Sequence, residues 1–295
     1  MAIVINTNLP VMIAENELQK ASAAINKSMQ RLSTGLRINS AKDDPAGSYI
    51  ASGLSTRLRG IQIAGQNVST GSSIIAVAEG DLSIIADHLD RIKELATQFA
   101  NDTLSTLEQD TIKDEVKQRV DEINRIASEA SFNKVKLLDG SRDNLRIQIG
   151  PDGSPDYNSL TIENVFKNAT TGQDGIKLFG DDAAAGQYAD VDAAFADAAT
   201  AADFMTVVES SLDDVNRRIA TAGVYQNRLE SISNLLLIQS ENLTSAYSSV
   251  VDADIAVETS NYVRNQILQQ TATTMLAQAN QVPGSIALNL IQSVM

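Results

Sequence analysis

The fold is decided by residues 50–99, which read IASGLSTRLRGIQIAGQNVSTGSSIIAVAEGDLSIIADHLDRIKELATQF. Apolar residues recur along this stretch with the alternating three-four spacing of a heptad. The positions are Leu54, Ile61, Val68, Ile75, Leu82, Leu89 and Ala96 in one set, and Ile50, Ala64, Ala78, Ile85, Ile92 and Phe99 in the other. Only Arg57 and Gly71 interrupt the seam. Such a sustained seam predicts one long helix, at about residues 45–101, that packs along an equally long partner.

A second heptad, closer to the C-terminus, supplies that partner. Its positions are Ala222, Tyr225, Leu229, Ile232, Leu236, Gln239, Leu243, Ala246, Val250, Ala253 and Val257. A shorter amphipathic helix lies between the two, with Ile112, Val116, Val120, Ile123 and Ala127 on one face. We therefore expect a mainly α fold, a long antiparallel coiled-coil bundle formed by the N- and C-terminal regions.

Turn residues divide the chain before and after this bundle. Residues 33–47 are rich in Gly, Asn, Asp and Ser; Asp43 and Asp44 suit an N-cap, and Pro45 suits the first helical turn. This break separates a terminal helix from the long one. Further on, residues 145–149 and 160–162 alternate apolar and polar side chains around a Pro- and Gly-rich turn, which predicts a small β-hairpin. The sequence then thins into Gly, Asp and Ala up to about residue 199, so we expect an exposed acidic loop after the hairpin, the two together occupying about residues 145–199.

Both ends of the chain lack charged side chains. Residues 1–14 and 265–295 contain no ionisable side chain, yet they mix Ile, Leu, Val and Met with Gln, Asn, Ser and Thr. Such segments are too polar to span a bilayer and too apolar to stay solvated. They are expected to be packing surfaces that need partners, which favours a protein that polymerises.

Charge and composition exclude several other functions. The net charge is −14, and residues 150–205 alone carry ten acidic residues against two lysines. No basic stripe is available for nucleic acid or an anionic membrane, so neither is an expected partner. Cysteine is absent, and the single histidine, His88, lies beside the heptad seam, where helix packing is the ordinary role. We predict no catalytic, cofactor-binding or metal-binding residues, and hence no enzyme.

Four motifs occur in order along the chain. Residues 32–47 read LSTGLRINSAKDDPAG, residues 118–140 read QRVDEINRIASEASFNKVKLLDG, residues 221–230 read TAGVYQNRLE and residues 267–283 read ILQQTATTMLAQANQVP. This series resembles the bacterial flagellins and, together with the intervening helices, covers nearly all of the chain. Residues 166–199 leave too little sequence for a large outer domain, so the resemblance is to a core-only flagellin.

The resemblance implies a structural subunit of the extracellular flagellar filament, a helical homopolymer for swimming. Residues 1–44 and 254–295 would form the inner filament core, and residues 45–253 the helical shaft with its hairpin and acidic loop. The implied core contacts are Leu18, Ile25, Leu32, Ile267, Leu268, Met275, Leu276, Gln278 and Asn280. For the last two amides there are two interpretations, solubility of the unfolded chain or hydrogen bonds inside a crowded tube. A hook-filament junction protein, which shares the terminal design, is the alternative function.

The resemblance also implies partners besides further copies. A secretory signal is not expected, because Asn6, Asn8 and Pro10 interrupt the apolar residues of the N-terminus. The family instead uses the flagellar secretion apparatus with an export chaperone, and filament cap and hook-junction proteins meet the assembled subunits. Folding on assembly would suit export of an unfolded chain.

A Toll-like innate immune receptor reads many flagellins through an arginine, a leucine and a glutamate. The matching residues here are Arg91, Leu95 and Glu115. A simpler interpretation is that Arg91 pairs with a carboxylate one helical turn away, Leu95 packs between helices and Glu115 keeps its helix soluble. The sequence leaves both interpretations open.

Overall fold

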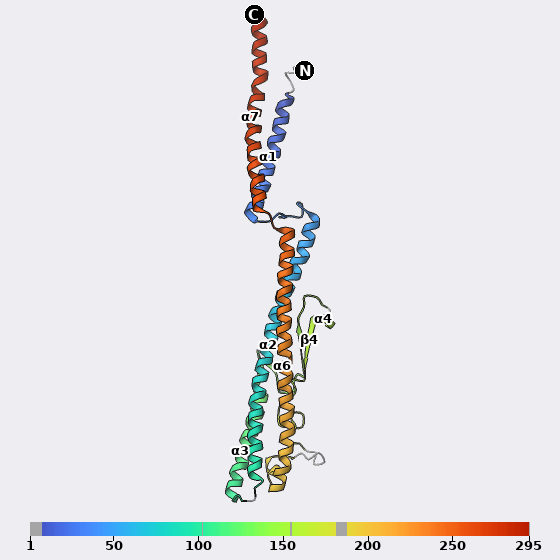
Figure 1. The fold of residues 1–295 in the computed structure, drawn as a ribbon, viewed down its shortest axis with the longest axis vertical. Coiled ribbons are helices and arrows are strands. Elements are labelled where there is room, and N and C mark those ends of the chain that lie inside the picture. Colours follow the sequence, from blue (N-terminus) through green and yellow to red (C-terminus); the bar gives the residue numbers. More distant parts are fainter. Residues whose placement is uncertain (1–7, 102, 154, 181–187, 295) are drawn as a thin grey trace. The chain divides into compact units, whose positions relative to one another are not determined.

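The computed structural model describes residues 8–101, 103–153, 155–180 and 188–294, with the backbone alone for residues 155, 156 and 282–294. Long helices dominate this part of the chain, as predicted (Figure 1). They are α1 (Leu9–Thr34), α2 (Pro45–Phe99), α3 (Thr106–Glu129), α6 (Ala198–Val251) and α7 (Ile255–Val294). The chain divides into two compact units, residues 57–241 and residues 1–56 with 242–295.

Within residues 57–241, α2 and α6 lie side by side and run antiparallel (Figure 1). Glu79 accepts a hydrogen bond from Gln226 at one point, and Lys93 Nζ lies 3.0 Å from Glu209 Oε1 at another. Because residue numbers rise along one helix as they fall along the other, these pairs fix an antiparallel register. The predicted seam of α2 is buried from Ile61 to Phe99, and Leu229 of α6 is buried opposite it.

The second heptad does not continue as predicted through Ala253 and Val257. Helix α6 ends at Val251, Ala253 lies between two helices, and Val257 is exposed on α7. The cause is local, because the Asp254 carboxylate accepts hydrogen bonds from the N–H groups of Ala256 and Val257 at 2.9 and 3.2 Å. This carboxylate caps the N-terminus of α7, so a separate helix begins after Asp254 and the heptad of α6 does not continue into it.

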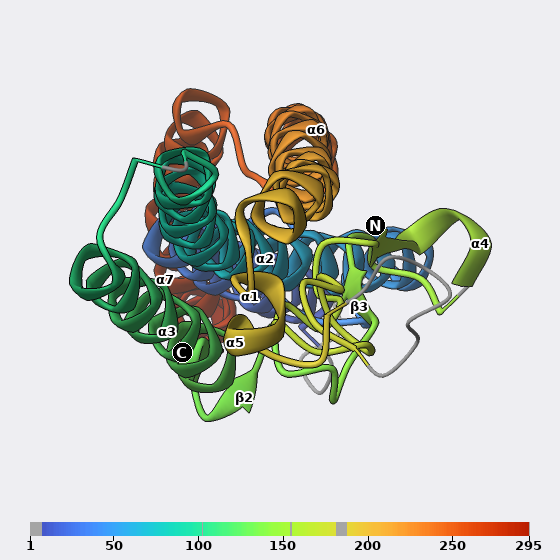
Figure 2. The same cartoon turned by 90° about the horizontal axis from the view of Figure 1, so that it is seen from below.

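Helix α3 packs beside α2 as a third column, and Figure 2 shows α2, α3 and α6 end-on. The helix begins with a capping box, in which Ser105 and Glu108 each bond the other's backbone N–H. Its five predicted apolar positions, Ile112, Val116, Val120, Ile123 and Ala127, are all buried. The amphipathic pattern therefore identified both the helix and the face that packs.

The predicted hairpin is present and docks on α2. Strands β3 (Asn144–Gln148) and β4 (Ser159–Glu163) pair antiparallel and are joined through the short helix α4 (Pro155–Asn158). A Cβ atom at Gly71 would lie 2.1 Å from Ile147 Cδ1, and one at Gly60 would lie 2.6 Å from Pro151 Cβ. Glycine interrupts the α2 seam at position 71 because the hairpin approaches the helix backbone there.

The expectation of an exposed loop is wrong, because more than half of the described residues between 166 and 199 are buried or half-buried. Phe166, Phe179 and Phe195 are buried, and the Phe195 ring meets the rings of Phe99 and Phe204 edge-on at 5.1 and 5.5 Å. Few large apolar residues interrupt the Gly, Asp and Ala of this segment, but those few all pack inward. The short helix α5 (Val191–Ala194) belongs to the same cluster. Residues 181–187 of the predicted loop lie outside the described residues.

A second small hairpin was not predicted. Strands β1 (Ser131–Phe132) and β2 (Val135–Lys136) pair across Asn133 and Lys134, which both adopt positive φ angles of 49° and 66°. Two successive positive φ angles make the tight turn that suits the twist of a hairpin. The turn lacks the glycine that is usual in such hairpins, so its residues do not predict it.

Helix α2 is also long and apolar enough to cross a membrane by length and composition. The mean hydropathy of its 18-residue window is 1.2, and 33% of that window is buried. One such helix is weak support for a membrane span, because core helices of water-soluble proteins pass the same test.

Candidate functional site

The terminal helices α1 and α7 form an antiparallel pair (Figure 1). Asn8 caps α1 with its side-chain oxygen, and its Nδ2 donates to the Ala279 carbonyl of α7 at 3.0 Å. Near the other end of α1, Arg31 Nη1 lies 3.4 Å from Glu258 Oε2. The helix then stops at Gly35, whose φ of 71° is the left-handed conformation that glycine adopts without strain. Two polar contacts therefore fix the register of the pair.

Few side chains are buried where α1 meets α7. On α1 these are Ala21, Ile25 and Ser28. Leu18 and Leu32 of α1 and Leu276 of α7 are half-buried. Of the nine predicted core contacts, Ile25 is thus the one that is buried within the pair of helices. A helix pair held by so small a core stabilises itself weakly, because helix stability in proteins comes mainly from packing.

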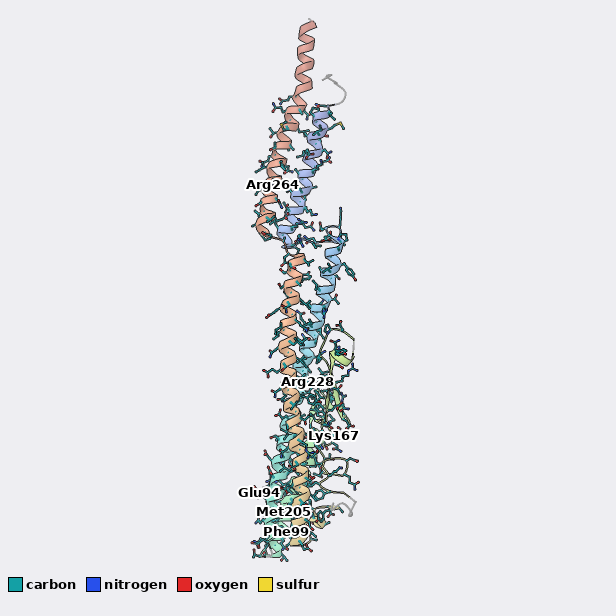
Figure 3. All side chains as sticks on the ribbon, turned by 45° about the vertical axis from the view of Figure 1, so that its right-hand side comes forward. Glu94, Phe99, Lys167, Met205, Arg228 and Arg264 are labelled. Atoms are coloured by element: carbon teal, nitrogen blue, oxygen red, sulfur yellow. The ribbon has the colours of Figure 1, made fainter. Side chains whose placement is uncertain are left out.

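Both helices expose large apolar side chains. On α7, Ile267, Leu268 and Met275 are 57%, 52% and 59% exposed, and the predicted amides Gln278 and Asn280 are exposed beside them. On α1, the exposed apolar residues are Leu9, Met12, Ile13 and Met29. After Arg264 (Figure 3) the sequence contains no charged side chain. Extended apolar surface of this kind is typical of an interface rather than of a solvated monomer.

A groove of about 660 Å³ runs between the two helices. Apolar side chains such as Ile13, Leu268 and Met275 line it together with several alanines, and Glu17 and Lys20 stand at its edge. The two charged residues pair with each other at 2.8 Å, so they bring no net charge to the groove. An apolar groove of this kind can take the apolar side chains of an amphipathic helix.

Charged contacts tie the C-terminal part of α1 to the connection that follows it. Lys27 Nζ lies 3.0 Å from Asp43 Oδ1, and the hydrogen bond from Lys27 lowers the pKa of Asp43 to about 2. Asp44 accepts the N–H of Gly47 at 3.0 Å and so caps α2, as the sequence predicted. Sequence reasoning missed the pairs of Lys27 and Arg31. A signal was available for Arg31, since its partner Glu258 is one of only two acidic residues in residues 254–295.

The three residues matched to receptor recognition lie together on α2 and α3. Arg91 Nε is 3.0 Å from Glu115 Oε1, and Arg91 Nη1 is 2.8 Å from Glu94 Oε2 (Glu94 is labelled in Figure 3). The hydrogen bonds that Arg91 donates, first to Glu94 and then to Glu115, raise the pKa of Arg91, and the hydrogen bond from Arg91 lowers the pKa of Glu115. Leu95 is 2% exposed. Arg91 and Glu115 thus offer polar atoms at the surface, whereas Leu95 packs between helices.

Beside this cluster, His88 of α2 faces Arg119 of α3, with 3.3 Å between Nδ1 and Nη1. Among the residues that the structure describes, no three His, Cys, Asp or Glu side chains converge in a way that would hold a metal ion. A cavity of about 960 Å³ elsewhere is lined by lysine, arginine and aspartate side chains such as Lys167 and Asp174. The site best supported by the geometry is therefore the apolar surface of α1 and α7.

Known proteins match this chain over most of its length. Residues 5–143 match the family model described as the bacterial flagellin N-terminal helical region, and residues 205–291 match the C-terminal helical region. Flagellin of Bacillus subtilis is 37% identical over 96% of this chain and 98% of its own length. A flagellar filament 33 kDa core protein of Treponema phagedenis is 34% identical, with the same coverage. A putative flagellar hook-associated protein from Vibrio parahaemolyticus shares the fold, with a TM-score of 0.59, 14% identity, and coverage of 71% of this chain and all of that one.

Proposed function

Because the chain belongs to the bacterial flagellin family, we propose that it is the bulk subunit of the filament and that its terminal helices order only when neighbouring copies cover them. The chain is a flagellin without a large outer domain, a structural subunit of the extracellular flagellar filament.

The observation that carries the proposal is the imbalance between covered and uncovered apolar surface on α1 and α7. Ordering one residue of backbone costs about 1–2 kcal/mol, and each helix must recover that cost from buried area. Within the pair, Ala21 and Ile25 are buried, whereas Leu268 and Met275 remain more than half exposed. Further copies would supply the missing contacts. The predicted core residues are therefore proposed as contacts between subunits.

Folding on assembly also fits the proposed export route. A terminal pair with so little core of its own is easily kept extended, and an extended chain passes a narrow secretion channel. We propose the flagellar secretion apparatus with an export chaperone as partners before assembly, and filament cap and hook-junction proteins as partners at the filament ends. Swimming motility would follow from the length of the polymer.

Seeded polymerisation of a charged variant tests the assembly surface. Leu268→Asp places a carboxylate on the charge-free face of α7, where an unpaired buried charge is costly. We expect the critical concentration for growth to rise at least about tenfold, which corresponds to about 1.4 kcal/mol. Gln173→Asp, on an exposed residue of the other unit, is the matched control and should assemble normally. Normal growth of Leu268→Asp would contradict the proposal.

The hook-filament junction alternative makes a different prediction in the same assay. A bulk subunit extends seeds into long filaments, whereas a junction protein stops after a short ring. The fold shared with a hook-associated protein does not separate the two functions, because that likeness is at 14% identity. Electron microscopy of seeds after incubation with excess subunit measures the added length directly.

We further propose that a Toll-like receptor contacts Arg91 and Glu115 of the dissociated subunit, with Leu95 holding α2 and α3 together beneath them. Arg91→Ala is expected to lower receptor activation by soluble subunit, because it removes the exposed cation of the cluster. Arg125→Ala removes an exposed arginine of α3 that pairs instead with Glu122 and Glu129, and it serves as control. Equal activation by both variants and by the unaltered chain would exclude this contact.

A further inference from the structure

His88 is the single histidine of the chain, and it sits at the seam between α2 and α3. Its ring is half-buried, and its Nδ1 lies 3.3 Å from Arg119 Nη1. A guanidinium group carries only donors, so the ring nitrogen in this contact must accept. That requires a neutral imidazole with its proton on Nε2.

Arg119 also contacts Glu115 on its own helix. Its Nη2 lies 3.4 Å from Glu115 Oε1, and the same oxygen accepts a hydrogen bond from Arg91 Nε at 3.0 Å. His88 and Arg91 belong to α2, while Glu115 and Arg119 belong to α3. The four side chains therefore join the two helices at two points, His88–Arg119 and Arg91–Glu115, and the contact between Arg119 and Glu115 within α3 connects these two points.

The charged groups that act on His88 come from both helices. Arg119 and Glu122 face it from α3, and Asp87 lies next to it on α2. Glu122 is itself held by Arg125 through an ion pair. Burial and then the Arg119 charge lower the pKa of His88, while Glu122 and Asp87 act in the opposite direction. The arrangement thus favours the neutral ring that the contact geometry requires.

We propose that His88 is a proton-sensitive latch between α2 and α3. In the neutral state, Nδ1 accepts a hydrogen bond from Arg119 and holds Arg119 where it also meets Glu115. When a proton from an acidic medium binds Nδ1, the acceptor becomes a donor, the hydrogen bond to Arg119 is lost and two cations face each other. The filament is extracellular, so its subunits meet the pH of the medium directly.

The sign of the effect follows from proton linkage. The unfolded chain binds a proton at His88 near the ordinary pKa of about 6.5, whereas the folded chain binds it only at lower pH. The latch therefore contributes fully above about pH 6.5, and its contribution is lost as the pH falls through the lower pKa of the folded state. Acid should loosen α3 from α2.

Titration of the imidazole by NMR tests the latch in the dilute full-length subunit, where the single histidine gives unambiguous signals. We expect the Nε2–H tautomer and a pKa below 6.5. Arg119→Gln should raise that pKa, while Lys117→Gln, which removes a cation of α3 paired with Asp192, should leave it nearly unchanged. An Nδ1–H tautomer, or a pKa that Arg119→Gln does not raise, would overturn the proposal.

Thermal unfolding of the same subunit provides the second test. In His88→Asn, the side-chain oxygen takes the place of Nδ1 and accepts from Arg119 without titrating. From about pH 7.5 to about pH 5, the midpoint temperature should therefore fall further in the unaltered chain than in His88→Asn. Equal falls in the two proteins would refute the latch. Neither test requires polymerisation, so either outcome is independent of the proposed assembly surface.

Discussion

Gly71 shows how a single missing side chain sets a tertiary contact. The residue lies in the middle of α2, where glycine costs about 1 kcal/mol relative to alanine. Its lack of a Cβ lets Ile147 of the hairpin pack against the helix backbone, because an added Cβ would lie 2.1 Å from Ile147 Cδ1. Gly65, six residues earlier in the same helix, has nothing within 4 Å of its Cβ position. Substitution of the two glycines by alanine is therefore expected to change the stability of the protein in opposite directions.

Gly71→Ala is expected to destabilise the unit of residues 57–241 by about 1–3 kcal/mol, since the hairpin must shift or the helix must bend to admit the methyl group. Gly65→Ala is expected to stabilise it by about 0.5–1 kcal/mol, because only the helix propensity changes. Urea unfolding of the dilute subunit, followed by circular dichroism, measures both. Equal effects of the two substitutions would show that the hairpin does not press on Gly71.

The Lys27–Asp43 pair gives a pH dependence that belongs to the ordered terminal region. In that structure the pKa of Asp43 is about 2, chiefly through the hydrogen bond from Lys27, against an ordinary value of 3.8. Because the folded pKa is depressed, the pair stabilises fully above about pH 4 and is lost as the pH falls through about 2.

Solid-state NMR of assembled filaments reads this pKa from the Asp43 carboxyl carbon. Lys27→Gln should move the pKa towards 3.8, whereas Lys42→Gln, on the exposed neighbour of Asp43, should not. A pKa of Asp43 near 3.8 in unaltered filaments would contradict the ion pair.

The helices and the β3–β4 hairpin could be predicted from the sequence because their patterns repeat over many residues. The heptad of α2 predicted its bounds within two residues, and the amphipathic pattern of α3 predicted its buried face except for Ile126. Patterns failed where structure depends on single contacts. The Asp254 cap divides one apparent heptad into two helices, and the inward packing of Phe166, Phe179 and Phe195 has no period to reveal it. For the terminal surface, the absence of charge predicted an interface but not the Arg31–Glu258 pair.

The rings of Phe99, Phe195 and Phe204 pack together and hold the connection between the β3–β4 hairpin and α6 against the helices. Phe195 is fully buried between the rings of Phe99 and Phe204. Phe195→Ala is expected to cost about 3–5 kcal/mol, as for other buried phenylalanines, and to lower the unfolding midpoint of the dilute subunit. Tyr157→Ala, on an aromatic residue that is 85% exposed, should change stability by no more than about 0.5 kcal/mol. A small effect of Phe195→Ala would contradict the burial of this ring and support the exposed loop that the composition predicts.

The two compact units of the subunit differ in how they are held together. Residues 57–241 bury a continuous core of Ile, Leu, Val and Phe and carry the α2–α3 network of Arg91, Glu115, Arg119 and His88. The pair of α1 and α7 buries few side chains and leaves long apolar faces uncovered. From this contrast we expect a shaft that folds in the single subunit and terminal helices that fold in the polymer. Under the proposed function, this difference would keep the terminal segments unfolded during export until the subunit reaches the growing end of the filament.

Amide hydrogen exchange of residues 8–34 and 255–294, measured in the dilute subunit and again after seeded growth, tests this expectation most directly. We predict rapid exchange of both segments in the subunit, alongside a protected core in residues 57–241, and strong protection of both segments in the filament. Terminal helices that are already protected in the dilute subunit, or that stay unprotected in the filament, would contradict folding on assembly.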